Sequence, residues 1–153
     1  MEKKRKKIVV IGLGNVLLRD DGVGVYVIEQ LRRRSVPKNV DVQFIDGGLT
    51  PDLSVFLDDV VSKLIIIDAA ETGGAPGNIR TVNPLDIRLE TSSIHGIDLQ
   101  QNLELMRLAG TLPEEVVILG VEPQDMSPGT ELTPALKAVV PDLLEHIRIL
   151  IES

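Results

Sequence analysis

The sequence predicts an α/β protein in which most strands of the central sheet run parallel. Short apolar segments alternate with helical segments along most of the chain, an order typical of a parallel sheet covered by helices. Aromatic residues make up only 2% of the composition, so the core must be built from Val, Ile and Leu, which suits strands buried on both faces. At 153 residues the chain has the length of one compact domain, and we expect a single domain over residues 1–153.

The first half of the chain contains three predicted strands and two predicted helices. The strands cover residues 7–13, 40–45 and 63–67, and the helices cover residues 21–34 and 51–60. The first helix would be capped by Asp20 or Asp21, because an aspartate at this position accepts hydrogen bonds from the first helical amides. The arginines at 32–34 would complement the negative end of its dipole.

The alternation of strand and helix changes after the third strand. Residues 72–77 form a loop rich in Gly and Pro, and a fourth strand is predicted at 78–82 with no helix before it. So short a connection cannot make a parallel crossover, so this strand should run antiparallel to its neighbour. The remaining predicted elements are a helix at 95–108 that buries Leu99, Leu103 and Met106 and stops at Gly110, a strand at 116–121, and a helix at 132–151.

Composition excludes several classes of partner. The net charge of −7 and the scarcity of aromatic residues disfavour nucleic acid. The basic residues 1–7 are followed by no apolar run of signal-peptide length, and no segment approaches the ~20 apolar residues of a membrane span. We therefore expect a cytoplasmic protein with no membrane contact. Because the chain has no cysteine, a bound metal would need carboxylate, imidazole, amide or water ligands, or ligands from a partner.

Aspartates follow each of the first three predicted strands. They are Asp20 and Asp21 after the first strand, Asp46 after the second and Asp68 after the third. Ligand sites of open α/β sheets lie outside the carboxyl ends of the strands, so these carboxylates should converge there. Convergent carboxylates favour a cation site, and a buried Asp68 could instead be satisfied by neighbouring amides.

Two further motifs leave alternatives open. Asp46-Gly47-Gly48-Leu49-Thr50 is equally consistent with a turn and with a functional loop whose bare amides a peptide could approach. His95 precedes a predicted helix, where a capping or packed role is the default. A helix N-terminus disfavours imidazolium, so a neutral, ligand-competent ring is expected.

Asp21, Asp68 and His95 would together form an O,O,N ligand set suited to a borderline divalent metal such as nickel or zinc. Other hydrolase machinery is missing from the sequence: it has no G-x-S-x-G, no H-E-x-x-H and no D-T/S-G turn. A dinucleotide site is disfavoured because Leu17 stands where the Gly12-x-Gly14 motif would need its third glycine.

These residues, in this order and spacing, resemble the maturation endopeptidases of nickel–iron hydrogenases. The resemblance covers nearly the whole chain and includes the segments 119–123 and 132–134. Its motif residues are Gly12, Gly14, Asn15, Leu17, Asp20, Asp21, Gly22 and Gly24, then Asp46, Gly47 and Gly48, then Ile67, Asp68 and Ala69, then His95. Asp21 stands where the family often has glutamate, and Leu49 separates the Asp-Gly-Gly motif from Thr50.

The resemblance implies a single three-layer α/β/α domain around a twisted sheet of about five strands. It implies an endopeptidase, expected to be a monomer, that removes the C-terminal extension of the hydrogenase large-subunit precursor after nickel insertion. Asp21, Asp68 and His95 would contact the nickel, which the substrate would bring. Asp46 would orient water or hold its loop, and Gly47, Gly48 and Thr50 would contact the substrate.

Two other functions remain open at this point. A receiver-like phosphoacceptor domain also carries acids after its first and third strands, but here the acid pair comes late in its loop and no lysine follows the fifth strand. A non-catalytic nickel-binding chaperone would bind the same precursor without cleaving it.

Overall fold

One mixed sheet of five strands organises the part of the chain that the structure describes. The structure is a computed structural model that describes residues 5–50, 52–58, 60–82 and 94–153, with side chains from residue 99 onward in the last range. The strands are β1 (Lys6–Leu13), β2 (Val40–Gly48), β3 (Val61–Ala69), β4 (Ile79–Val82) and β5 (Glu115–Val121). Their order is β2-β1-β3-β5-β4, and every neighbouring pair is parallel except β4 with β5.

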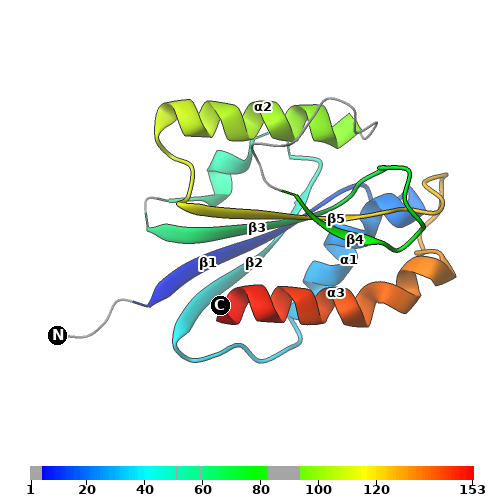
Figure 1. Cartoon of the computed structure of the whole chain (residues 1–153), viewed down its shortest axis with the longest axis horizontal. Helices are drawn as coiled ribbons and strands as arrows, with labels where there is room; N and C mark the ends of the chain where they lie inside the picture. Colours follow the sequence, from blue (N-terminus) through cyan, green and yellow to red (C-terminus); the bar gives the residue numbers. More distant parts are fainter. Residues whose placement is uncertain (1–4, 51, 59, 83–93) are drawn as a thin grey trace.

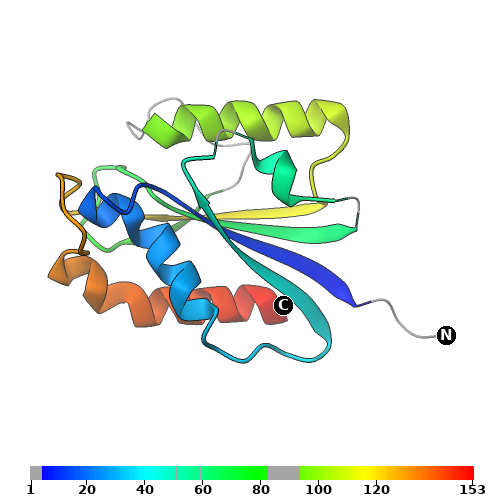
Figure 2. The same ribbon diagram turned by 180° about the vertical axis from the view of Figure 1, so that it is seen from behind.

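Helices cover both faces of this sheet (Figures 1 and 2). The helices are α1 (Val23–Leu31), α2 (Ile94–Ala109) and α3 (Pro134–Glu152), with short 3-10 helices η1 (Arg19–Gly22) and η2 (Leu53–Phe56). The apolar cluster on one face contains residues of α1 and α3, whereas the cluster on the other face contains residues of α2 and η2. The predicted α/β class, the mostly parallel sheet and the antiparallel fourth strand are thereby confirmed.

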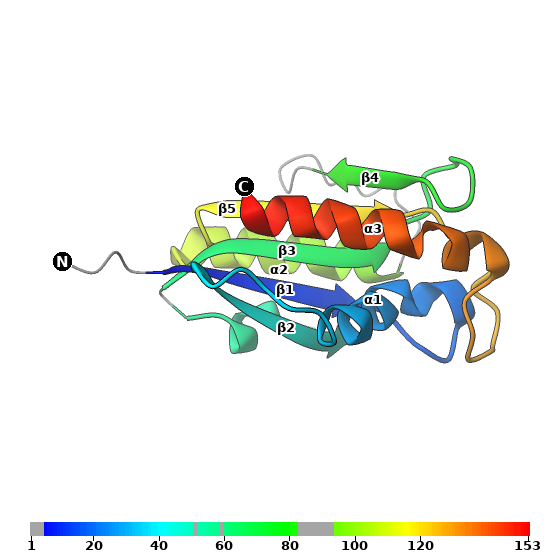
Figure 3. The ribbon, with the colours of Figure 1, turned by 90° about the horizontal axis from the view of Figure 1, so that it is seen from below.

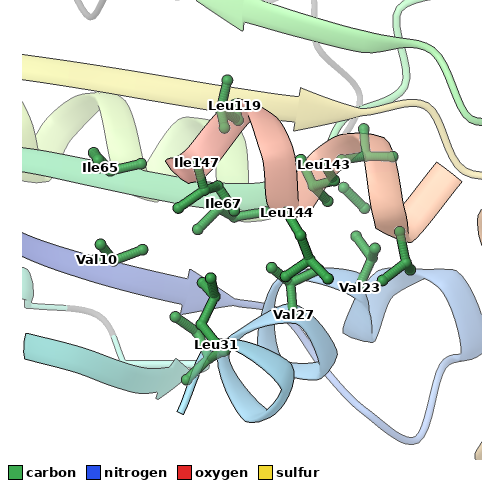
Figure 4. Close-up of a cluster of buried hydrophobic side chains, with 14 of the residues drawn as sticks. Val10, Val23, Val27, Leu31, Ile65, Ile67, Leu119, Leu143, Leu144 and Ile147 are labelled. Atoms are coloured by element: carbon green, nitrogen blue, oxygen red, sulfur yellow. The ribbon is translucent and has the colours of Figure 1, made fainter. Parts of the chain in front are cut away.

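The core is built from aliphatic side chains, as the composition predicts. Figure 4 shows one cluster, in which β1, β3 and β5 face α1 and α3. Its labelled members are Val10, Val23, Val27, Leu31, Ile65, Ile67, Leu119, Leu143, Leu144 and Ile147. Burial of each such side chain contributes about 1.5–3 kcal/mol. The three residues predicted to be the buried face of α2 are also in the core, with Leu99 8%, Leu103 4% and Met106 3% exposed.

Two predicted helices differ from the structure. The first begins at Val23 rather than Asp21 and ends at Leu31, and neither aspartate caps it, because its N-cap is Gly22 with no side-chain hydrogen bond. The carboxylates of Asp20 and Asp21 accept hydrogen bonds elsewhere. The helix predicted at 51–60 is instead the single 3-10 turn η2, whose cap Asp52 accepts a hydrogen bond from the Ser54 amide at 3.0 Å.

The strand order reverses between β1 and β3. Because β1 lies between β2 and β3, the connection through α1 passes over one face and the connection through η2 passes over the other. Figure 3 shows the four parallel strands ending at the same edge of the sheet, which we call the carboxyl edge. Ligands of open α/β sheets bind in the crevice at such a switch point.

Candidate functional site

The loop after β1 is held tightly against the start of α1 by glycines. Gly14 has φ +131°, and a Cβ at this position would lie 1.9 Å from the Asp21 carbonyl oxygen. A Cβ on Gly24 would lie 2.3 Å from the Ile67 carbonyl oxygen and 2.7 Å from that of Leu13. The start of α1 therefore packs directly on the ends of β1 and β3, which brings the loop after β1 beside the end of β3.

Asp21 and Asp68 are the two predicted site carboxylates that this packing brings to the same edge of the sheet. Asp21 lies in η1, which contacts β3, and its Oδ2 accepts a hydrogen bond from the Asn15 amide at 2.8 Å. Asp68 is the penultimate residue of β3 and is paired in register with Gly120 of β5. The two residues are only 4% and 5% exposed. Buried carboxylates at a strand end are costly unless they are hydrogen-bonded, paired with a charge or bound to a cation.

Asp46 lies apart from that pair, at the end of the edge strand β2. It is exposed, it is paired in register with Gly12, and its Oδ1 accepts a hydrogen bond from the Gly48 amide at 3.0 Å. Gly48 has φ +49°, and the Thr50 amide donates to the Gly47 carbonyl at 2.9 Å. Asp46 therefore builds the turn, one of the two interpretations that the sequence allows.

The turn after β2 is also joined to the loop after β1. The Gly14 amide donates to the Gly48 carbonyl at 2.9 Å. Gly47 is buried, and a Cβ there would lie 2.7 Å from the Ile11 Cγ2. Gly47, Gly48 and Thr50 thus belong to the carboxyl edge, and their predicted substrate contacts stay a prediction.

His95 is the second residue of α2, and its side chain lies outside the described residues. In the described parts of the chain, no three His, Asp or Glu side chains are grouped closely enough to hold a metal ion. The predicted ligand set of Asp21, Asp68 and His95 therefore stays a prediction. The other histidine, His146, is exposed on α3.

Two buried carboxylates at this edge have roles that the sequence did not reveal. Asp20 is fully buried, and Glu122, just after β5, is 7% exposed. Glu122 accepts hydrogen bonds from the Thr72 amide at 2.8 Å, the Thr72 hydroxyl at 2.9 Å and the Gly73 amide at 3.2 Å. These hydrogen bonds hold the loop after β3 against the residue that follows β5. Both acids lie in the resemblance motifs, but nothing in those motifs indicates their partners.

The carboxyl edge therefore carries four buried acids. Two of them, Asp21 and Asp68, are buried where the strand order reverses, and the other two, Asp20 and Glu122, fix the surrounding loops. Fold and site together define an open α/β protein with buried carboxylates at the switch point of its sheet, where proteins of this architecture bind ligands.

Comparison with known proteins identifies the family to which the chain belongs. The family model described as HycI, hydrogenase maturation protease, matches residues 25–149. The chain belongs to the hydrogenase maturation protease family and is a peptidase, as the motif resemblance predicted.

Named relatives and solved structures agree with this assignment. The hydrogenase 2 maturation protease of Escherichia coli K12 is 32% identical over 147 residues, covering 92% of this chain and 88% of the relative. The hydrogenase expression/formation protein HoxM of Cupriavidus necator is 33% identical over 145 residues, covering 90% and 70%. The structure of the hydrogenase maturating endopeptidase HybD from E. coli superposes with a TM-score of 0.82 at 29% identity, covering 95% and 92%. The maturation protease HycI from Thermococcus kodakarensis, at 24% identity and a TM-score of 0.75 over 98% and 95% of the two chains, supports the fold.

Proposed function

We propose that this peptidase removes the C-terminal extension of the nickel–iron hydrogenase large-subunit precursor after nickel insertion. In this proposal Asp21, Asp68 and His95 contact nickel that the substrate carries. The observation that supports it best is the burial of Asp21 and Asp68 at the same edge of the sheet, in a chain of the hydrogenase maturation protease family.

The chemistry of the chain suits a metal supplied by the substrate. Because the chain has no cysteine, any thiolate ligands of the nickel must come from the precursor. Two carboxylates and a neutral imidazole complement such a partly coordinated borderline metal. Held between the two proteins, the nickel would position the scissile bond or polarise its carbonyl.

Asp46 has a different role from the nickel-contacting residues in this proposal. Its hydrogen bond to the Gly48 amide supports the role of holding the turn rather than orienting water. The turn would present Gly47, Gly48 and Thr50 to the precursor peptide at the carboxyl edge. The peptide would then run along the rim that the turn after β2 and the loop after β1 form together.

The test is to incubate the protein with the precursor, with and without nickel, and to measure intact masses. We expect loss of a C-terminal peptide only from the nickel-loaded precursor. Asp21→Asn and Asp68→Asn should lower the cleavage rate by roughly 100-fold or more, because each removes a charged contact to the metal. Asp41→Asn is the matched control, an exposed acid in the first half of β2, and should cleave normally.

The same experiment separates the other functions. Cleavage of nickel-free precursor, or wild-type rates in Asp21→Asn and His95→Ala, would contradict the assigned roles. Binding of the precursor without cleavage would support the chaperone function. The receiver-like alternative has lost its support, because β4 is antiparallel and the chain belongs to a protease family.

A further inference from the structure

Asp20 is a buried acid that accepts hydrogen bonds from three residues far along the chain, and the proposed chemistry does not use it. Its side chain is fully buried. Its Oδ2 accepts from the Gln124 amide at 2.9 Å, the Asp125 amide at 3.0 Å and the Thr133 hydroxyl at 2.8 Å, and its Oδ1 accepts from the Thr133 amide at 2.8 Å. These partners lie 104 to 113 residues further along the chain. Charge-assisted bonds of this kind are about twice as strong as neutral ones.

We infer that Asp20 is a positioning residue of the peptidase, which locks the loop after β1 to the loop between β5 and α3 and thereby fixes Asp21 at the carboxyl edge. The inference rests on the proposed function, because it takes Asp21 as a nickel-contacting residue. Figure 3 shows the two loops side by side at the carboxyl edge, where α3 begins.

Backbone hydrogen bonds join the same two loops. The Asp20 amide donates to the Asp125 carbonyl at 3.1 Å, and the Arg19 amide donates to the Gly129 carbonyl at 3.2 Å. In the other direction the Gly129 amide donates to the Leu17 carbonyl at 2.9 Å. The two segments thus pair like short strands, and the Asp20 carboxylate closes one end of that pairing.

This pairing holds the backbone of Arg19 in a sparsely populated conformation. Arg19 has φ +46°, the only positive φ of a non-glycine residue in the described ranges. The left-handed region costs an L-residue roughly 1–2 kcal/mol, so surrounding bonds must maintain it. A Cβ on Gly129 would lie 2.6 Å from the Arg19 Cζ, which shows how closely the arginine side chain packs on that glycine.

The position of Asp21 depends on this pairing of the two loops. Its amide donates to the Leu18 carbonyl at 3.1 Å, its carboxylate accepts from Asn15, and its carbonyl lies against Gly14. Each of those contacts lies inside the loop after β1. The bonds of Leu17, Arg19 and Asp20, described above, tie that turn to the distant loop. Loss of the Asp20 bonds should weaken this connection and let Asp21 move relative to Asp68.

The Thr133 side chain bonds to Asp20 rather than to the helix that it begins. Thr133 is the N-cap of α3, where a threonine side chain usually accepts from a helical amide, yet here it makes no such bond. Its hydroxyl instead donates to Asp20. The Thr133 side chain therefore joins the hydrogen bonds around Asp20 instead of capping α3.

The test is the kinetics of precursor cleavage by Asp20→Asn and Thr133→Val. The Asn side chain keeps the shape of Asp20, but its NH2 group cannot accept hydrogen bonds from the amides and the hydroxyl that surround Asp20. Some of the bonds between the two loops are therefore lost. Thr133→Val removes the hydroxyl and leaves the backbone amide bond. We expect kcat to fall roughly 10- to 100-fold in Asp20→Asn, because small misplacements of a catalytic group have effects of that size, and less in Thr133→Val. KM for the nickel-loaded precursor should change little, and Thr133→Ser should restore the wild-type rate.

Lys63→Met is the matched control, because Lys63 is a buried charge that contacts the other end of α3. It should reduce stability while leaving kcat unchanged. If Asp20→Asn lowers kcat no more than Lys63→Met does, the inference is wrong. If Asp20→Asn does not fold, a wild-type kcat in Thr133→Val overturns it. If the wild-type protein does not cleave the nickel-loaded precursor, the proposed function fails instead, which is a separate outcome.

Discussion

The two ends of α3 are each held by a fully buried charged residue, Asp20 from η1 and Lys63 from β3, yet the two residues have different consequences. At the carboxyl edge Asp20 accepts from Thr133, where α3 begins. At the opposite edge the Lys63 ammonium donates to the Leu150 carbonyl at 2.6 Å and the Ser153 hydroxyl at 2.8 Å, where α3 ends. A negative group at the helix start and a positive group at its end both complement the helix dipole.

The difference lies in what each charge holds besides the helix. Lys63 contacts the end of α3 and, at 3.5 Å, the exposed Glu115, so its removal should affect stability alone. Asp20 is adjacent to Asp21 and joins two loops at the carboxyl edge. Burial and charge are therefore insufficient to mark a functional residue, and the neighbours of the buried group decide its role.

The largest expected effect comes from closing the narrow gap between α1 and the sheet at the carboxyl edge. In Gly24→Ala the new Cβ would meet backbone oxygens of Leu13 and Ile67, which cannot rotate away. We expect a loss of about 3 kcal/mol or more in the free energy of unfolding, measured by urea denaturation. Gly110→Ala is the control: its φ is +73° but nothing lies within 4 Å of its Cβ, so the cost should be about 1 kcal/mol. Equal losses in the two variants would contradict this account of the packing.

Periodicity and composition predicted much of the fold, because those signals are local. The uninterrupted apolar run of β3, and the Leu99, Leu103 and Met106 spacing in α2, each identify an element and its buried face. The short connection into β4 also predicted its direction.

The local signals failed where a side chain bonds far along the chain. The sequence around Asp20 is typical of a helix N-cap, but its acceptor oxygens face the amides of residues 124, 125 and 133. Glu122 likewise bonds a loop 49 to 50 residues earlier. No local pattern encodes these partners. Asp21 and Asp68 could be selected because both follow strands, and strand ends of a parallel sheet meet at a common edge.

The next largest effect should come from Lys63→Ala at the other end of α3. The change removes both close hydrogen bonds and leaves a cavity where a fully buried side chain was. We expect the free energy of unfolding to fall by about 2–3 kcal/mol. The kcat for precursor cleavage, measured below the unfolding temperature, should equal that of the wild type. A loss of kcat would show that the two ends of α3 are coupled. It would contradict the claim that Lys63, unlike Asp20, affects stability alone.

The smallest expected effect is a pH dependence of stability at the Lys63 end of α3. Burial lowers the pKa of Lys63 below its usual value, and the nearby Glu115 opposes this shift only in part. With the folded pKa lowered, the unfolded chain binds the proton more readily, so protonation of Lys63 disfavours the folded state at neutral pH. This penalty should decline as the pH rises through the folded pKa toward the unfolded value near 10.4. Unfolding free energies of the wild type and Lys63→Met, measured from pH 7 upward, should show the wild type gaining stability relative to the variant. A difference that shrinks over that range would mean that the acceptors stabilise the ammonium more than burial penalises it, and a constant difference would mean that the two effects cancel.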